Sequence, residues 1–332
     1  LATAYYLSKV FGVRNVAVLE KGYLGSGNVG RNTTIIRSNY LLQGNNPFYE
    51  FSMKLWEGLE QDFNFNAMVS QRGVINLFHS DAQRDAYTRR GNAMRLHGVD
   101  AGLRGRDQLR EKLPFLDYEN ARFPIMGGLM QKRGGTVRHD AVAWGHARGA
   151  DSRGVDIIQN CEVTGFRVEN GTCVGVETSR GFIGAKKTGC AVAGSSGRLM
   201  AKAGMRLPIE SHVLQAFVSD GLKPILPGVI TSGAGHFNCS PSDQGGRVVG
   251  GALDVNARRY PAAHPFPGDG RAPLQRAVLD PRQNPPLPVV SRHPQGTLHK
   301  EKAFSFPPHA GVRASVVGLG TSGIIQGIVD AV

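Results

Sequence analysis

The first twenty residues constrain the fold of this chain more than any other segment. Residues 1–11 place apolar side chains at helical spacing, and Gly12 follows as a residue suited to end a helix. Residues 15–20 then form a short apolar run that closes on Glu20, the pattern of a buried parallel strand. A helix, a tight turn and an apolar strand with a terminal acid form the second half of a dinucleotide-binding βαβ unit. In such a unit the acid accepts hydrogen bonds from ribose hydroxyls, so the sequence predicts an α/β fold with Glu20 at a nucleotide site.

The first strand and the glycine turn of that unit would precede residue 1, and we expect the chain to begin where the turn ends. Two later stretches match the same G-x-G-x-x-G pattern, residues 25–30 and 318–323. Residues 31–36 after the first stretch are rich in β-branched side chains and suit the opening turn of a helix poorly. The second stretch lies too near residue 332 for another strand and a ribose acid to follow. We interpret both as glycine-rich turns, with a fingerprint as the alternative at 318–323.

Composition divides the chain near residue 255. Residues 255–332 hold eleven of the 18 prolines and show no apolar periodicity, whereas regular elements are predicted up to Asp254. A structureless stretch of this length is unusual inside a compact domain. We therefore treat 255–332 as an irregular Pro/Arg-rich segment. Its abrupt start suggests a frame-shifted or mis-assembled translation, with the frame recovered near Gly323.

Between these limits, apolar spacing and turn residues predict the regular elements. Helices are expected over 50–59, 81–96 and 141–153, strands over 73–78, 155–163 and 190–194, and a hairpin that joins 173–178 to 182–186. Asp140 is a suitable N-cap for the third helix. The last strand runs into a glycine turn, where the backbone N–H groups of Ala193 and Gly194 could approach a phosphate or a flavin edge.

The cysteines and the apolar runs exclude two classes of protein. The four cysteines form no C-x-x-C pair and have no ligand spacing with histidine, which argues against a zinc or other metal site. We interpret them as free thiols of an intracellular, cytoplasmic protein. No apolar stretch approaches the roughly 20 residues that a membrane span needs.

Five stretches of the chain resemble one family of flavoproteins. They are residues 1–40, 70–80, 139–148, 154–166 and 207–219, and the likeness is continuous over about 1–254. These stretches are similar to the beta subunits of heterotetrameric sarcosine oxidases, which belong to the glycine/D-amino-acid oxidase class of FAD-dependent enzymes. Motifs of this length are far more specific than a lone glycine pattern.

The resemblance implies an FAD-binding, Rossmann-like domain interleaved with an α+β substrate domain. The FAD-binding domain would comprise 1–40 and 139–206, without its first strand and glycine turn. The substrate domain would comprise 41–138 and 207–254. After about 255 the likeness ends, and the family's late Gly- and Lys-containing segment, which supplies a cation for the substrate carboxylate, is absent.

The resemblance also implies an activity, two flavins and partner subunits. The family oxidises sarcosine to glycine and formaldehyde with noncovalent FAD, and electrons reach oxygen to give H2O2. A second flavin, FMN, is attached through a histidine, which corresponds to His139. The partners would be the alpha, gamma and delta subunits. This chain has Arg138 and Ala141 where the family has a lysine and a second histidine, so the surroundings of the FMN site differ.

Carried over residue by residue, the family pattern assigns a cofactor site. Glu20 would hold the FAD ribose, and the backbone of Val163 would contact the adenine. The pyrophosphate and the flavin would be lined by Asn28, Arg31, Asn32, Thr33 and Ile35.

By similarity to monomeric relatives of the family, Arg37 is a candidate for binding the substrate carboxylate. It lies in a Thr/Ile-rich run, where an unpaired charge is costly to bury, and a planar guanidinium suits bidentate capture of a carboxylate. The alternative is a structural salt bridge with Glu50 or Asp62.

Three other functions stay open. The substrate could be dimethylglycine, proline or another N-methyl amino acid, and the chain could be an inactive fragment of such an enzyme. The formal net charge of +13 also suggests a nucleic-acid-binding protein. The basic residues are scattered, however, without interleaved aromatic residues or a nucleic-acid motif, so we expect no nucleic-acid partner.

Overall fold

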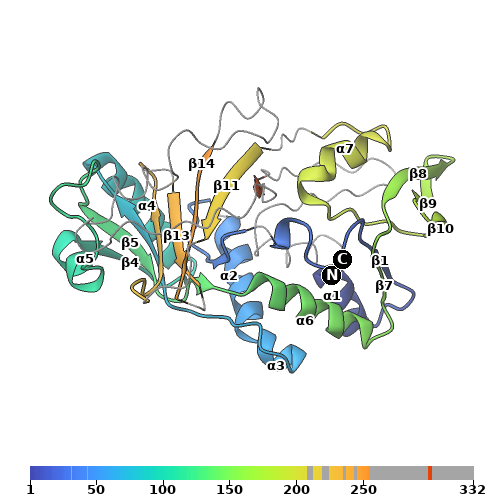
Figure 1. Cartoon of the computed structure of the whole chain (residues 1–332), viewed down its shortest axis with the longest axis horizontal. Coiled ribbons are helices and arrows are strands. Elements are labelled where there is room, and N and C mark those ends of the chain that lie inside the picture. The colour runs from blue at the N-terminus through green and yellow to red at the C-terminus, as the bar shows by residue number, and fades with distance from the viewer. Residues whose placement is uncertain are drawn as a thin grey trace.

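The computed structural model describes residues 1–30, 32–42, 44–207, 212–218, 224–234, 237–242, 245–253 and 298–300. Figure 1 shows a large sheet at one end of the molecule and a small antiparallel sheet at the other, with helices between them. None of the described helices is both long enough and apolar enough to cross a membrane. The predictions for the Pro/Arg-rich segment fall on residues outside the described ones, apart from a short strand at Leu298–Lys300.

The helix and the parallel strand predicted from residues 1–20 are confirmed, although β1 is only partly buried rather than buried. Helix α1 (Ala2–Phe11) ends at Gly12, which has φ of 62° and donates its N–H to the Leu7 carbonyl. Strand β1 (Ala17–Leu19) pairs in parallel with β7 (Asp156–Ile158). Helix α6 (His139–Asp151) precedes β7 and packs against α1. The two paired strands are therefore separated in the sequence by the long segment 20–155.

An eight-stranded sheet combines segments from before and after β7. Its order is β15–β11–β14–β13–β12–β3–β5–β4, with β12 and β3 parallel and the other pairs antiparallel. The strands are β3 (Val74–Phe78), β4 (Ala101–Gly105), β5 (Gly127–Gln131), β11 (His212–Val218), β12 (Val229–Ser232), β13 (Phe237–Pro241), β14 (Arg247–Leu253) and β15 (Leu298–Lys300).

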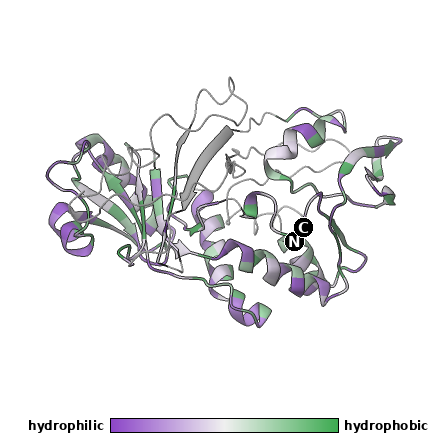
Figure 2. Cartoon of the chain, in the orientation of Figure 1, coloured by the Kyte–Doolittle hydropathy of each residue, from purple (hydrophilic) through white to green (hydrophobic). Residues whose placement is uncertain are grey.

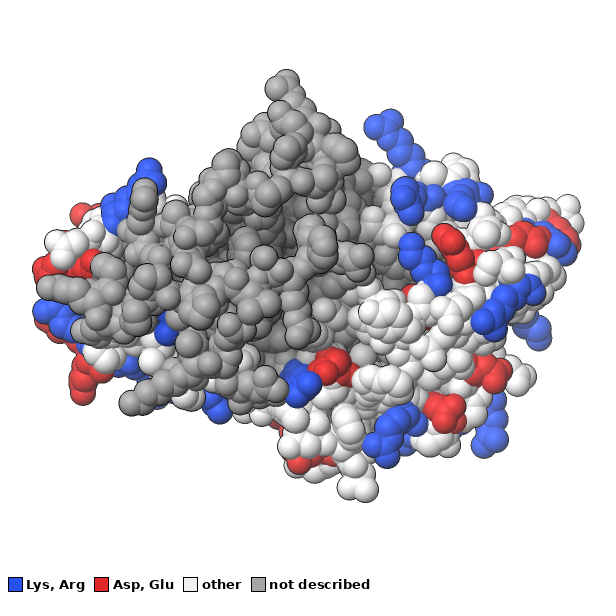
Figure 3. All heavy atoms as spheres, viewed as in Figure 1, with Lys and Arg blue, Asp and Glu red and all other residues white. Residues whose placement is uncertain are grey.

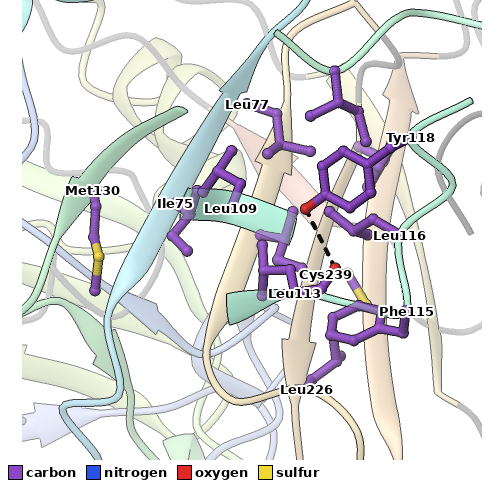
Figure 4. Close-up of a cluster of buried hydrophobic side chains, with 13 residues drawn as sticks. Ile75, Leu77, Leu109, Leu113, Phe115, Leu116, Tyr118, Met130, Leu226 and Cys239 are labelled. Atoms are coloured by element: carbon purple, nitrogen blue, oxygen red, sulfur yellow. Dashed lines mark hydrogen bonds between the residues drawn. The ribbon is translucent and has the colours of Figure 1, made fainter. Parts of the chain in front are cut away.

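The two faces of this sheet carry different layers. Ile75 and Leu77 of β3 point into a core with α5 (Arg106–Lys112) and the segment after it, which Figure 4 shows. There the Tyr118 hydroxyl donates to the Leu113 carbonyl at 3.3 Å. On the opposite face, α4 (Asp81–Leu96) packs against β5 through its own apolar cluster. In Figure 2 many residues of α4 and α5 are hydrophilic, as expected for helices with one side in water.

A second hydrophobic core lies between the segment that follows β1 and helix α6. Helices α2 (Asn45–Glu57) and α3 (Leu59–Phe63) pack with the two-stranded sheet formed by β2 (Ile35–Ile36) and β6 (Gly135–Thr136). The buried side chains of this cluster are Ile36, Met53, Trp56, Leu59, Ala67, Val137 and Val142.

The predicted hairpin is confirmed within a three-stranded antiparallel sheet of β8 (Val163–Glu169), β9 (Thr172–Thr178) and β10 (Gly181–Gly184). Two short 3₁₀ helices, η1 (Asn28–Gly30) and η2 (Ala193–Ser195), and helix α7 (Ser196–Ala201) complete the described elements. All four cysteines are free thiols, as predicted. The mixed sheets and helices confirm the α/β fold class, whereas the domain boundaries stay predictions.

Two predicted strands are wrong. Residues 155–163 are not one strand but β7 and the start of β8, because the chain turns at Asn160, which has φ of 53°. Residues 190–194 form no strand and are not buried in a sheet; they lead into η2. A strand needs a hydrogen-bonded neighbour, and among the described strands none pairs with this segment.

Two predicted helix boundaries also differ. Asp140 is not the N-cap of α6, because the helix begins at His139 after Arg138. The Asp140 carboxylate instead accepts hydrogen bonds from Arg138 and from the Ala141 N–H. The helix expected over 50–59 begins earlier, at Asn45, and α3 follows it directly.

Glycine closes the loop that follows β1. A Cβ at Gly30 would lie 2.0 Å from the Gly25 carbonyl oxygen, whereas a Cβ at Gly27 would meet no atom within 4 Å. The loop leads through η1 to β2 rather than into an α-helix. This confirms that residues 25–30 form a glycine-rich turn.

Gly30→Ala should therefore destabilise the fold, because the added methyl group would collide with backbone. We expect the free energy of unfolding in urea to fall by about 2 kcal/mol, the usual cost of overpacking. Gly27→Ala, a matched change in the same loop, should stay within about 0.5 kcal/mol of the original chain. Equal losses for both variants would contradict the loop geometry.

His146 makes stability depend on pH. It lies on α6, buried against the rings of Tyr5 and Tyr6 of α1 and Phe63 of α3, and burial lowers its pKa to about 3. Below the ordinary histidine pKa, the unfolded chain binds a proton that the folded chain does not. The free energy of unfolding should therefore fall as the pH falls from about 6.5 towards 3.

We expect this one group to remove about 2 kcal/mol between pH 7 and pH 5. His146→Phe keeps an aromatic ring in place but cannot be protonated, so its stability should decline correspondingly less over that range. Urea unfolding at several pH values measures both slopes. Parallel curves for the two proteins would show that His146 is not the titrating group.

Candidate functional site

The site forms where β1 and β7 end side by side. The Glu20 N–H donates to the Ile158 carbonyl and the Glu20 carbonyl accepts from the Cys161 N–H, both at 2.9 Å. Its carboxylate Oε1 accepts hydrogen bonds from the Gly22 N–H at 2.9 Å and from the Ser26 hydroxyl at 3.4 Å. The backbone thus holds Glu20 at the strand end, which is the position that a ribose-binding acid occupies in a dinucleotide fold.

The N-terminal end of α1 lies near this carboxylate. Glu20 lies close enough to Leu1, the N-cap of α1, for its charge to act there. A helix N-terminus carries partial positive charge and unpaired N–H groups, which favour phosphate. The acid and the helix end together fit the ribose and the phosphates of a dinucleotide such as FAD.

The loop from Asn28 to Ile35 reaches from this strand end to the large sheet. The Asn32 side chain holds the loop: its Nδ2 donates to the Asn28 and Val29 carbonyls, and its Oδ1 accepts from the Thr34 N–H. Thr33 touches the sheet, because its carbonyl accepts from the Ser240 hydroxyl at 3.0 Å. Ile35 lies in β2, η1 packs against α6, and Arg31 lies outside the described residues.

His139 is the first residue of α6, and its side chain is half-buried. Its Nδ1 is buried and has no hydrogen-bond partner among the described residues. Burial lowers the pKa of His139, Asp140 opposes that shift, and Arg138 adds to it. A neutral imidazole with an unpaired nitrogen fits a covalent or hydrogen-bonded cofactor better than a solvated surface role.

Arg37 follows β2 and is half-buried among aromatic rings. Its guanidinium lies over the Tyr40 ring, 5.7 Å from the centroid, and Tyr40 stacks on Tyr49 at 4.1 Å. The predicted alternative, a salt bridge with Glu50 or Asp62, is wrong. Glu50 pairs with Arg133, and Asp62 pairs with Lys9 at 2.7 Å.

The remaining predicted residues lie towards the small antiparallel sheet. Val163 begins β8, and Ala193 and Gly194 lie in η2, next to α7. The Lys202 ammonium group donates to the Thr164 carbonyl at 2.7 Å, which ties the end of α7 to β8. Ala193 has φ of 44°, a left-handed conformation that non-glycine residues rarely adopt outside functional or strained sites.

Sequence reasoning missed two polar groups at the strand ends. The Gln159 side chain follows β7 and accepts the Leu24 N–H at 2.8 Å, and the Ser26 hydroxyl bonds to Glu20. Gln159 follows its strand as Glu20 follows β1, and polar residues after neighbouring parallel strands share one sheet edge. Once β1 and β7 are known to be neighbours, the polar residue after β7 can be predicted to lie near Glu20.

Surface charge gives no support to a nucleic-acid role. In Figure 3, basic and acidic side chains are interspersed on both ends of the described surface in view, without a continuous basic band. Phosphate-driven binding normally needs such a band.

Comparison with known proteins gives consistent matches. The model of the FAD dependent oxidoreductase family matches residues 1–284. The chain is 78% identical over 254 residues to sarcosine oxidase subunit beta of Rhizobium meliloti (strain 1021), which covers 76% of this chain and 61% of that protein. It is 42% identical over 316 residues to sarcosine oxidase subunit beta of an Arthrobacter species, covering 90% and 78%. The chain thus spans about three fifths of the length of the first of these relatives.

Among solved structures, L-proline dehydrogenase from P. horikoshii matches with a TM-score of 0.80 at 21% identity, over 98% of this chain and 87% of that one. At this identity the likeness shows the fold alone. The family model covers most of the chain, and the Arthrobacter relative is matched over more than two thirds of its length. The chain therefore belongs to the FAD dependent oxidoreductase family.

Proposed function

We propose that this chain is the beta subunit of a multi-subunit oxidase that acts on sarcosine. The reaction would convert sarcosine, oxygen and water to glycine, formaldehyde and H2O2. The observation that carries the proposal is the 78% identity over 254 residues to a protein named sarcosine oxidase subunit beta. The partner subunits would be of the alpha, gamma and delta types.

FAD would lie along the strand ends that Glu20 marks. Glu20 would bind the ribose, and the loop that contains Asn28, Asn32, Thr33 and Ile35 would line the pyrophosphate and the flavin. Arg31 would belong to the same loop. Bound FAD would supply the chemistry by accepting the hydride from the substrate's methyl carbon.

The other end of the cofactor would reach the region of the small sheet. The backbone of Val163 would contact the adenine, and the N–H groups of Ala193 and Gly194 would approach a phosphate or the flavin edge. The strained φ of Ala193 supports this role, because such conformations persist where a site requires them.

FMN would be attached through His139. The buried Nδ1, which has no partner in the part of the chain that the structure describes, supports this assignment, since a buried nitrogen without a hydrogen bond costs free energy. The lowered pKa keeps the imidazole neutral near pH 7 and so keeps a ring nitrogen nucleophilic.

Arg37 would bind the carboxylate of the amino acid. Its guanidinium is held over Tyr40 and has no carboxylate partner among the described residues. A planar guanidinium can give two parallel hydrogen bonds to a carboxylate, which fixes the orientation of the N-methyl group.

The substrate can be tested by anaerobic flavin reduction. We expect sarcosine to bleach the visible flavin absorbance of the FAD-loaded chain, prepared with its partner subunits, at least tenfold faster than dimethylglycine or proline does. Stopped-flow absorbance measures the rates. Faster bleaching by dimethylglycine or proline would reassign the substrate, and a loaded flavin that no N-methyl amino acid reduces would overturn the proposed activity.

The FMN link can be tested in a denaturing gel. Flavin fluorescence should survive denaturation in the unmodified protein and disappear in His139→Ala, because only a covalent flavin stays with the unfolded chain. His97→Ala, at the C-terminal end of α4 and away from α6, is the matched control and should keep the fluorescence. Fluorescence that persists in His139→Ala would place the attachment on another residue.

A further inference from the structure

A second half-buried arginine, Arg90, lies on α4. After burial, the Arg37 charge is among the causes that lower the pKa of Arg90, and the Tyr40 ring under Arg37 is among those that oppose the shift. The Arg90 guanidinium lies over the Tyr87 ring, 5.5 Å from the centroid. Burial is the main cause that lowers the pKa of Arg90; Tyr87 opposes it, and the positive charge of Arg37 adds to it. The charges of two half-buried arginines from distant segments thus act on each other.

Both arginines belong to one face of the large sheet. Side chains alternate along a strand, so Asn76 of β3 shares a face with Leu129, its cross-strand partner on β5. Leu129 packs against α4 in a cluster that also includes Tyr87. On the same face, Asn39 donates its Nδ2 to the Asn76 Oδ1 at 2.5 Å. The helix with Arg90 and the segment with Arg37 therefore lie over the same face of β3 and β5.

The backbone next to Arg37 is held firmly. The Ser38 N–H donates to the Gln131 Oε1 at 3.0 Å, and the Ser38 hydroxyl donates to Glu50 at 2.8 Å. Ser38 and Asn39 are both buried. Positions fixed in this way preorganise a binding group, because little freedom is lost when a ligand arrives.

Five acids of helices α2, α3 and α4 form ion pairs with other basic residues. Glu50 and Glu57 pair with Arg133, Asp62 pairs with Lys9, and Asp81 and Asp85 pair with Arg84. In the described part of the chain, no carboxylate forms a salt bridge with Arg37 or Arg90. Two like charges near each other and partly out of water are costly, and an anion between them removes that cost.

We propose that Arg90 is a second carboxylate-binding residue, and that a substrate carboxylate lies between the guanidinium groups of Arg37 and Arg90. Each guanidinium lies over a ring and makes no hydrogen bond to another residue in the part of the chain that the structure describes, and its N–H edge can give paired hydrogen bonds to carboxylate oxygens. The identity of the ligand as an amino acid rests on the proposed function, but the anion site itself does not. Arg90 would thereby help the enzyme select amino acids over simple amines.

The test is equilibrium binding of a probe that needs no catalysis. Acetate and its neutral isostere acetamide are titrated into the full chain and followed by saturation-transfer NMR. We expect acetate to bind tighter than acetamide, and Arg90→Ala to weaken acetate at least tenfold without changing acetamide. Arg90→Lys should recover part of the loss. Arg89→Ala, an exposed neighbour on α4 with the same change in charge, should bind acetate as the original chain does.

Three results would overturn the proposal. They are equal acetate affinity in Arg90→Ala and Arg89→Ala, equal affinity of the original chain for acetate and acetamide, and tighter binding of inorganic phosphate than of acetate. A thermal unfolding midpoint of Arg90→Ala within a few degrees of that of Arg89→Ala shows that lost binding is not lost folding.

The same variants separate this proposal from the proposed activity. If the site is right and sarcosine is the substrate, Arg90→Ala should raise the sarcosine concentration for half-maximal flavin reduction at least tenfold, with a much smaller effect on dimethylamine, which has no carboxylate. If sarcosine fails to reduce the flavin while acetate binding still depends on Arg90, the activity is wrong and the carboxylate site stands.

Discussion

The parallel pairing of β1 with β7 is the constraint on which the rest of the structure depends. It joins Ala17–Leu19 to Asp156–Ile158, so the chain must leave the nucleotide unit, build strands β3, β4 and β5 of the large sheet and then return. The pairing also places the Glu20 backbone between Ile158 and Cys161, where the strand ends meet. Without it, Glu20 would be an acid at the end of a short exposed strand. With it, the acid, the end of α1 and Gln159 share one edge.

Buried polar contacts then connect this edge to the large sheet. The chain after β2 could slide over an apolar surface, because apolar contacts have no direction. Ser38 and Asn39 prevent this, since each bonds to a specific side chain of β5 or β3. Leaving either partner unpaired would cost free energy, so the position of Arg37 between these segments is defined by hydrogen bonds rather than by packing alone.

Elements set by local signals were predictable, and elements set by distant partners were not. Gly12 ends α1 and α4 spans 81–96 as expected, because capping and apolar spacing act within a few residues. The strand at 190–194 failed because strands need neighbours that composition does not reveal. The same difference between local and distant determinants applies to the site residues. Glu20 follows from its own strand, whereas the salt-bridge partners of Arg37 were misassigned because Arg133 and Lys9 lie closer to Glu50 and Asp62 in the fold.

Unpaired polar groups in this protein separate into two kinds by their surroundings. The Nε2 of His146 has no partner among the described residues, yet aromatic rings surround the imidazole and its low pKa keeps it neutral. The fold therefore tolerates the free-energy cost of this unpaired nitrogen inside the core. His139 begins a helix that η1 packs against, and Arg37 lies beside a loop that reaches both sheets. Both groups lie near the loop that we propose to line the cofactor. That position, rather than the absence of a partner alone, is the reason to propose binding roles for His139 and Arg37 and not for His146.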